Sequence, residues 1–319
     1  MDLASTPFAT TAIVLIIAGA LTKSAIIPTH FWLPGAMAAP TPVSAYLHSA
    51  AMVKAGIYLV ARLAPALHVV DSWHLVLIPL GVGTMLLGGW MALKQYDLKL
   101  ILAYGTVSQL GFILAVTSVG SAAALQAGLA LTCAHSLFKA TLFMIVGAID
   151  HTTGTRNITK LSRLGRRAPL LAGLAVISAL SMAGIPPLLG FASKESALTA
   201  ILHEEQLVGM PRSLLLVGVV AGSVLTMAYA LRFLWGAFAG REASKAVEGM
   251  HPAGPLLWAP PALLTAGTIA FGLWPRPLSA AIAAPIDAAF PEAHLHGLSL
   301  WHGWTPRWDC RRSSWPPVR

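Results

Sequence analysis

The chain has 319 residues, of which 56% are hydrophobic and only 10% are charged, and its mean hydropathy is +0.71. This composition lies outside the range of soluble domains and predicts a polytopic membrane protein. The net charge of +9 does not indicate a nucleic-acid partner, because the basic residues fall mostly between apolar segments and form no long run of their own.

Apolar segments long enough to cross a membrane recur along the chain. They fall near residues 8–27, 43–66, 74–93, 98–118, 122–148, 169–202, 213–239 and 254–275. Every backbone polar group at membrane depth must be hydrogen bonded, so these segments predict an all-α, polytopic transmembrane helix bundle with about eight spans. Basic residues concentrate in alternate loops, around Lys94, Arg156 and Arg232. The positive-inside rule places these loops on the cytoplasmic side.

Two of the spans contain residues that interrupt a helix, and each interruption is close to a lysine. The interrupting residues are Pro28, Pro34, Gly35, Pro40 and Pro42 after Lys23, and Gly184, Pro186, Pro187 and Gly190 before Lys194. Both spans are predicted to be discontinuous helices, which occur at membrane depth only where the irregular backbone is buried or lines a cavity. The alternative is that these residues merely kink packed helices.

The segment 125–149 carries ionisable side chains in the middle of an apolar run. As a helix it spans about 37 Å, enough to cross a hydrocarbon core of about 30 Å. His135 and Lys139 are four residues apart, so they share one helix face. A cation at bilayer depth costs about 3 kcal/mol or more, so this face is expected to contact protein or water rather than lipid. It is therefore a candidate path for protons or ions.

Further ionisable and amide side chains fall within the predicted spans. The set is Lys23, His48, Lys54, Gln109, His135, Lys139 and Lys194. Burial disfavours the ammonium form of lysine, so lysines spaced by histidine and water can pass protons. Taken singly, these residues have structural explanations: His48 can hydrogen-bond a neighbouring helix, and Lys99 can extend to the cytoplasmic face. Together, the buried lysines predict a proton-conducting axis.

Other chemistries find little support in the sequence. It contains no HExxH motif, no Cys/His cluster with zinc spacing and no glycine-rich nucleotide loop, so we expect neither a metal nor a cofactor. His48 and His135 could ligate a haem, but Lys139 would then place a charge against the porphyrin. A purely structural membrane subunit, which would need none of the lysines, is a further alternative.

The chain changes character after Trp274. Residues 276–290 form a weak apolar stretch interrupted by Pro285, and residues 301–319 are rich in Trp, Arg and Pro without helical or strand periodicity. We therefore divide the chain into a transmembrane domain, residues 1–275, and a tail, residues 276–319, that is peripheral or disordered.

Several stretches carry a resemblance to a known family. They are KSAIIPTHFWLPGAMAAPTPVSAYLHSAAMVKAGIYLVARL, DLKLILAYGTVSQLGF and HSLFKATLFMIVGAI. Over residues 15 to 240 the chain resembles the antiporter-like membrane subunits shared by respiratory complex I and the multi-subunit, Mrp-type cation/proton antiporters. Within this superfamily, DHTTGTRNITKL followed by SMAGIPPLLGFASKE is most similar to the A subunit of the sodium/proton antiporters. A membrane-arm subunit of NADH:quinone oxidoreductase (complex I) is the alternative.

The resemblance implies roles for individual residues. The positions that match the family's proton relay are Lys23, His48, Lys54, His135, Lys139 and Lys194. Lys23 matches the lysine that pairs with a glutamate of an earlier helix, and Lys194 matches the outlet lysine of the second broken helix. The helices that carry the partner glutamate have no counterpart in this sequence. We therefore expect a truncated chain or one completed by another chain, and no transport by this chain alone.

The resemblance also implies the surroundings of the chain. Residues 1–275 would form a partial antiporter-like, proton-conducting domain within a hetero-oligomeric complex in the bacterial inner membrane. The expected partners are other subunits of that complex, the lipid bilayer, protons and Na⁺. No redox centre is visible in the sequence, so we expect a transporter subunit rather than an enzyme. Redox activity would belong to a complex I-type assembly.

Overall fold

The computed structural model describes residues 9–68, 70–161, 163–204, 207, 209–239, 245–293 and 297–298. Among these residues the secondary structure is helical, apart from one isolated bridge between Asp97 and Asn157. The helical segments are α1 (Ala9–Lys23), η2 (Thr29–Phe31), α2 (Trp32–Gly35), η3 (Ala36–Ala38), α3 (Thr41–Ser49), α4 (Lys54–Leu67), α5 (Asp71–Leu93), α6 (Leu98–Thr117), α7 (Ala122–Thr153), α8 (Leu164–Arg167), α9 (Pro169–Ala183), α10 (Leu189–His203), α11 (Met210–Phe238), α12 (Lys245–Glu248), α13 (Pro255–Leu273) and α14 (Arg276–Ala289).

These helices confirm the predicted membrane bundle. Six stretches of the described chain are long and apolar enough to cross a membrane, with α3 and α4 counted as one stretch. Two shorter apolar helices, α9 and most of α1, complete the set. Together they match the eight apolar segments expected from the sequence. The chain is therefore a multi-pass, all-α membrane protein.

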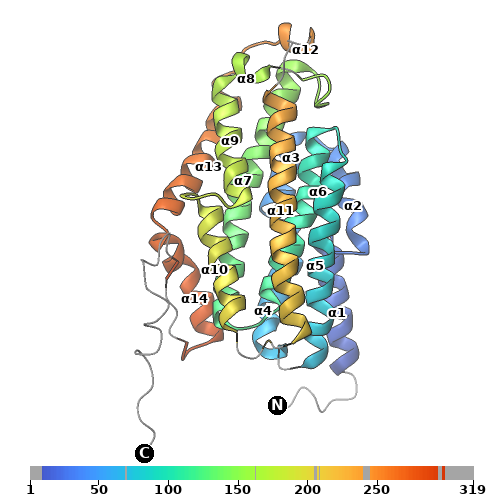
Figure 1. The fold of residues 1–319 in the computed structure, drawn as a ribbon, viewed down its shortest axis with the longest axis vertical. Helices are drawn as coiled ribbons and strands as arrows, with labels where there is room; N and C mark the ends of the chain where they lie inside the picture. Colours follow the sequence, from blue (N-terminus) through green and yellow to red (C-terminus); the bar gives the residue numbers. More distant parts are fainter. Residues whose placement is uncertain are drawn as a thin grey trace, which may run out of the picture.

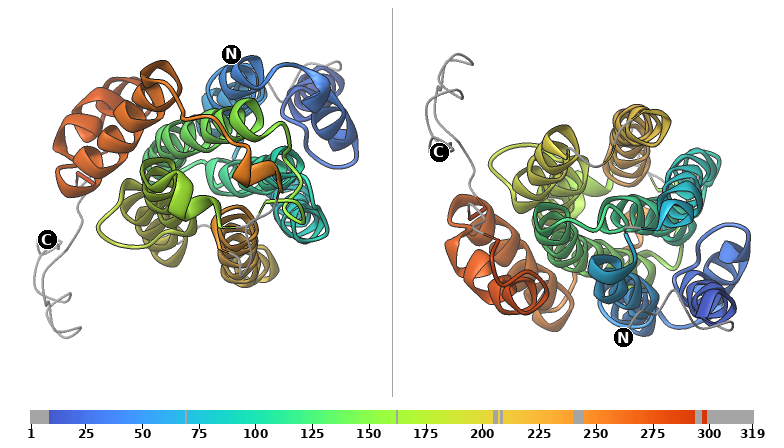
Figure 2. Two further views of the ribbon diagram at one scale, coloured as in Figure 1. Left: turned by 90° about the horizontal axis from the view of Figure 1, so that it is seen from above. Right: turned by 90° about the horizontal axis from the view of Figure 1, so that it is seen from below.

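Helices α6 and α7 lie at the centre of the bundle, and the others surround them (Figure 2). α7 packs against α3, α6, α9, α10 and α13, and α6 packs against α5, α7 and α11. Nearly every residue of α6 is buried, which suits a helix that is apolar on all sides. The outer helices expose apolar side chains instead, including Val217 and Trp235 on α11. Such a surface suits contact with lipid.

The two ends of the bundle differ in charge. The α5–α6 connection, α8 and α12 lie at one end, whereas the α4–α5 and α10–α11 connections lie at the other (Figure 1). The first end holds Lys94, Lys99, Arg156, Lys160, Arg163, Arg166, Arg167 and Arg232. This distribution agrees with the alternate basic loops that the sequence indicates.

The break predicted before Lys194 is confirmed. Helix α9 ends at Ala183, and Gly184 adopts a left-handed conformation with φ of +85°. The N–H of Gly184 donates to Ser181 O and that of Ile185 to Leu180 O, both at 3.0 Å, which is a Schellman motif. Pro186 and Pro187 follow, so the helix cannot continue before α10 begins at Leu189.

The break predicted after Lys23 is also confirmed. Helix α1 ends at Lys23, and the chain then turns, with the Ile26 N–H donating to Leu21 O at 3.0 Å. Three short helical pieces, η2, α2 and η3, follow in place of a continuous helix. Their shortness agrees with the density of proline and glycine between Pro28 and Pro42.

A third break, between α3 and α4, was not expected. The segment 43–66 reads as one span, yet residues 50–53 leave the α-helical pattern and Lys54 begins α4. The N–H of Met52 donates to Leu47 O at 3.1 Å, five residues back rather than four. No proline or glycine lies between residues 50 and 53, so the local sequence carries no signal for this interruption.

The predicted tail is partly helical. Arg276–Ala289 forms α14, which packs against α7 and α13 at the outside of the bundle. Its buried side chains are Leu278, Ile282 and Ile286, spaced four residues apart on one face. This part of the tail is therefore a helix with one buried face. Residues 301–319 lie outside the described residues.

Candidate functional site

Lys54 lies at the unexpected break and points toward α7. Its side chain is only 7% exposed. The Nζ atom donates to Thr132 O at 2.8 Å and to Ser136 Oγ. Because Lys54 is the first residue of α4, its stem leaves the backbone where α3 and α4 separate, and its charge reaches the middle of α7. The break thus places this ammonium group inside the bundle.

His135 lies on α7 between two lysines. Its ring is buried and lies near the Ser49 backbone, and neither ring nitrogen makes a hydrogen bond of normal geometry among the described residues. Lys54 reaches Ser136, the next residue of α7, and the ring of Phe138 packs edge-on against the His135 ring, with the two centroids 5.5 Å apart. A buried polar group without a partner is costly unless water or a proton-exchanging group reaches it. The His135 ring therefore lies in the interior with its polar atoms poorly compensated.

Lys139, one helical turn after His135, is fully buried. Its Nζ atom donates to Leu102 O of α6 at 3.1 Å and lies 5.7 Å from the centroid of the Tyr229 ring of α11. Within the described residues no carboxylate pairs with it. At Lys139, this face of α7 therefore contacts protein, as expected, rather than lipid.

Lys194 lies on α10, directly below the break that follows α9. Its Nζ atom donates to Ala183 O, a carbonyl left open by the end of α9, at 3.0 Å. A Cβ built on Gly184 would lie 2.7 Å from Lys194 Cδ, so the lysine stem lies against this glycine. Lys194 therefore contacts the open carbonyl end of the broken helix.

His48 and Lys23 occupy different environments. His48, on α3, is buried between the rings of Trp32 and Phe143, at centroid distances of 6.5 and 6.2 Å. Its Nδ1 atom has no partner in the described part of the chain, so the suggested bond to a neighbouring helix does not form through this atom. Lys23 ends α1 and is exposed. It is the one predicted relay residue that the fold leaves at the surface.

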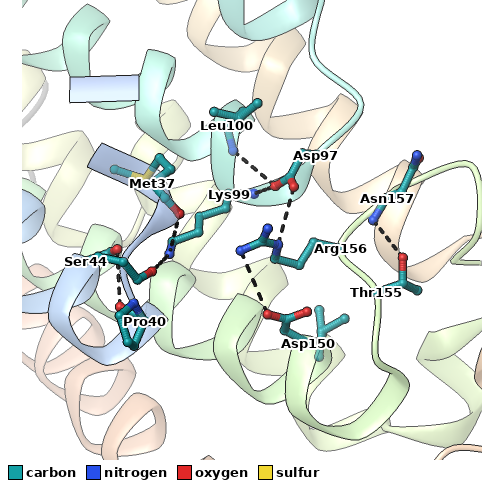
Figure 3. Close-up of polar contacts among 12 residues, drawn as sticks. Met37, Pro40, Ser44, Asp97, Lys99, Leu100, Asp150, Thr155, Arg156 and Asn157 are labelled. Atoms are coloured by element: carbon teal, nitrogen blue, oxygen red, sulfur yellow. Dashed lines mark hydrogen bonds and ion pairs between the residues drawn. The ribbon is translucent and has the colours of Figure 1, made fainter. Parts of the chain in front are cut away.

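Lys99 does not extend to the cytoplasmic face, and that expectation is wrong. Its side chain is 1% exposed, and Nζ donates to Met37 O at 2.9 Å and to Ala39 O (Figure 3). These carbonyls lie at the end of the interrupted segment after α1. The short pieces η2, α2 and η3 leave carbonyls without helical partners, and Lys99 supplies the missing donors.

Charged residues surround Lys99 at this end of the bundle (Figure 3). Asp97 caps α6 by accepting from the N–H of Lys99 at 2.7 Å. Arg156, in the loop after α7, lies 3.3 Å from Asp97 and 3.9 Å from Asp150. This cluster therefore joins the start of α6, the end of α7 and the segment after α1.

The arrangement divides the predicted relay into a gathered part and an outlying part. Lys54, His135 and Lys139 come together around α7, whereas Lys194 lies at its own break and Lys23 lies outside. No group of three or more His, Cys, Asp or Glu side chains in the described ranges could hold a metal ion. The gathered side chains can bind and release protons, which is the chemistry their residue types allow.

Sequence reasoning missed Tyr229 as a member of the site. Its OH group accepts from Gln109 Nε2 at 3.2 Å, and its ring covers Lys139. A buried tyrosine hydroxyl usually needs a hydrogen-bond partner. The tyrosine in the apolar segment 213–239 is therefore the only local sign in the sequence that a polar side chain lies nearby. Its proximity to Lys139 is set by the packing of α11 against α6.

Fold and site together define a multi-pass membrane protein with lysines in its interior, a class in which such residues mark ion pathways. Residues 2–226 match the family described as NADH:quinone oxidoreductase/Mrp antiporter, transmembrane. The chain belongs to this family.

Several relatives are similar over nearly the whole chain. It is 40% identical to the A1 subunit of the Na(+)/H(+) antiporter of Staphylococcus saprophyticus, over 96% of this chain and 40% of that protein. It is also 40% identical to the A/B subunit of a probable K(+)/H(+) antiporter of Rhizobium meliloti, over 93% of this chain and 30% of that protein. The chain thus spans two-fifths or less of the length of these relatives.

Solved structures agree with these relatives. A chain in the Mrp complex from Dietzia sp. DQ12-45-1b superposes with a TM-score of 0.84 at 43% identity, covering 95% of this chain and 33% of that chain. A chain of the membrane-bound sulfane sulfur reductase, an archaeal respiratory membrane complex, superposes with a TM-score of 0.76 at 25% identity, covering 91% and 58%.

Proposed function

We propose that this chain is part of the membrane domain of a multi-subunit cation/proton antiporter of the Mrp type. In this role it would pass protons along Lys23, His48, Lys54, His135, Lys139 and Lys194. The names of the relatives, which are antiporter subunits, support this function. Because the chain spans only part of their length, transport would belong to the assembled complex.

One observation carries the proposal: two buried lysines, Lys54 and Lys139, and the partly buried Lys194 have no carboxylate partner among the described residues. Lys54, Lys139 and Lys194 donate only to backbone carbonyls and a serine hydroxyl. A buried ammonium group is expensive when no opposite charge compensates it, so the neutral amine is accessible to such a residue. A series of side chains that can each be protonated or neutral can transfer protons from one to the next.

Lys23 would join this row only where another polypeptide segment covers α1. It is exposed at the end of α1, and the same helix also exposes the apolar residues Val14, Leu15 and Ile16, about two turns earlier. A lysine next to an apolar surface at a helix break is unfavourable against lipid. We propose that other subunits of the complex, or a further segment of the same protein, cover this face.

The test is cation-dependent proton flux in everted membrane vesicles that contain the chain and its complex. A pH-sensitive dye reports whether added Na⁺ or K⁺ collapses an imposed pH gradient. Both cations are needed because the relatives' names differ in the cation. We expect one of them to collapse the gradient, and no such effect with Lys139→Ala. Lys94, exposed at the basic end, provides the matched control Lys94→Ala, which should transport normally.

A membrane-arm subunit of an NADH:quinone oxidoreductase is the second candidate. The family description includes this enzyme, and the superposition on an archaeal respiratory membrane complex favours it further. In this case the vesicles would acidify on addition of NADH and a quinone, and neither Na⁺ nor K⁺ alone would move protons. The two results are mutually distinguishable in the same vesicles.

A further inference from the structure

The ammonium group of Lys139 occupies a narrow space between the backbone of α6 and the ring of Tyr229. Nζ donates to Leu102 O at 3.1 Å and lies 5.7 Å from the ring centroid. A Cβ built on Gly105 would lie 2.9 Å from this Nζ and 3.0 Å from Tyr229 Cε2. The absence of a side chain at Gly105 therefore leaves the room that both the ammonium group and the ring use.

Tyr229 is itself held in one orientation. Its ring is fully buried, its OH group accepts from Gln109 Nε2 at 3.2 Å, and it donates to Gly105 O at 3.5 Å. Gln109 Nε2 also donates to Thr226 Oγ1 at 3.1 Å, one turn before Tyr229 on α11. Hydrogen bonds from α6 thus fix a ring that α11 supplies, and the ring face stays turned to Lys139.

We propose that Tyr229 is a positioning residue for Lys139. The Tyr229 ring and the Leu102 carbonyl together form a binding position, here called the seat, for the Lys139 ammonium group. The seat holds this side chain when it is charged and releases it when it is neutral. This inference rests on the proposed function, in which Lys139 gains and loses a proton. An aromatic face attracts a cation but not a neutral amine. A carbonyl likewise binds a charged donor about twice as strongly as a neutral one.

The consequence is a change of position coupled to charge. When Lys139 gives its proton to a neutral acceptor, the amine loses most of its attraction to the seat. Its four-carbon stem can then turn away from α6. His135 lies one turn earlier on the same face, and its ring nitrogens make no hydrogen bond of normal geometry among the described residues. The seat therefore determines the position of the Lys139 side chain in its protonated form.

The first experiment measures cation-dependent proton flux in vesicles for three variants. Tyr229→Leu removes the ring and should lower the rate about fivefold or more. Tyr229→Phe keeps the ring face and should retain most of the rate. Gly105→Ala crowds the ammonium group and should lower the rate as well. The matched controls are Phe233→Leu, a fully buried residue one turn after Tyr229, and Gly83→Ala, where an added Cβ meets nothing within 4 Å.

The second experiment does not depend on transport. The thermal midpoint of the detergent-solubilised complex is measured for Tyr229→Leu, Lys139→Met and the double variant, and for the same cycle with Phe233→Leu. Contact between ring and ammonium predicts non-additive shifts for Tyr229 and additive shifts for Phe233. Equal flux losses in Tyr229→Leu and Phe233→Leu, or an additive Tyr229 cycle, would overturn the proposal. Normal flux in Lys139→Met with a non-additive cycle would instead refute the relay and leave the contact standing.

Discussion

Lys99 and Lys139 are both fully buried lysines, yet their surroundings are opposite. Lys99 donates to two carbonyls, of Met37 and Ala39, and the carboxylates of Asp97 and Asp150 lie nearby. Lys139 donates to one carbonyl and faces a tyrosine ring, with no carboxylate partner among the described residues. Burial alone therefore does not assign a role to a lysine.

The difference lies in what compensates each charge. At Lys99 the ammonium group donates to two backbone carbonyls that lack helical donors, and Arg156 lies on the two neighbouring carboxylates, so replacing the lysine leaves these carbonyls without a donor. At Lys139 the compensation is partial, and the neutral amine is accessible. We infer that Lys99 ties the basic end of the bundle together and that Lys139 changes its charge. The comparison can be tested by replacing each lysine with a residue that keeps the charge.

The largest effect is expected at Lys139. Lys139→Ala should abolish cation-dependent proton flux while the complex still inserts and assembles, because the side chain makes a single hydrogen bond. Lys139→Arg should also abolish flux, since arginine keeps its proton at any accessible pH. Flux is measured in vesicles, and assembly by native gel electrophoresis. Flux at the original rate in either variant would contradict a proton-transfer role.

A smaller effect, on stability rather than transport chemistry, is expected at Lys99. Lys99→Met leaves the Met37 and Ala39 carbonyls buried without donors and should destabilise the protein by about 2 kcal/mol. Lys99→Arg keeps the charge and the donors and should recover much of this loss, the reverse of its effect at Lys139. The measurement is the thermal midpoint in detergent, with Lys94→Met as the exposed control. Equal midpoints for the Met and Arg variants would remove the distinction between the two lysines.

The smallest effects are expected among the half-exposed charges around Lys99. Asp97→Asn keeps the cap of α6 but loses the ion pair with Arg156, and such partly exposed pairs contribute about 0–1 kcal/mol. Asp97→Ala also loses the cap and should cost about 1 kcal/mol more. High salt should erase the effect of the Asn variant and leave that of the Ala variant. A salt-insensitive loss in Asp97→Asn would mean that the carboxylate acts on the buried Lys99 directly.

Much of the fold could be predicted because the signals are local. Hydropathy located the eight spans, and proline and glycine located the breaks after Lys23 and before Lys194, since both kinds of residue act on their own backbone. The break before Lys54 could not be found in this way. It contains neither residue type, so only packing of α3 and α4 against α7 distinguishes it from a continuous helix.

The sequence by itself determined a multi-pass helix bundle, two of its breaks, and the shared face of His135 and Lys139, because periodicity and backbone chemistry act over a few residues. Tertiary structure alone decided which lysines have partners. Lys99 meets Met37, 62 residues away, and Gln109 meets Tyr229, 120 residues away. Such contacts depend on which helices pack side by side, and hydropathy does not encode that arrangement. The difference between the surroundings of Lys99 and those of Lys139 therefore emerges only in the folded chain.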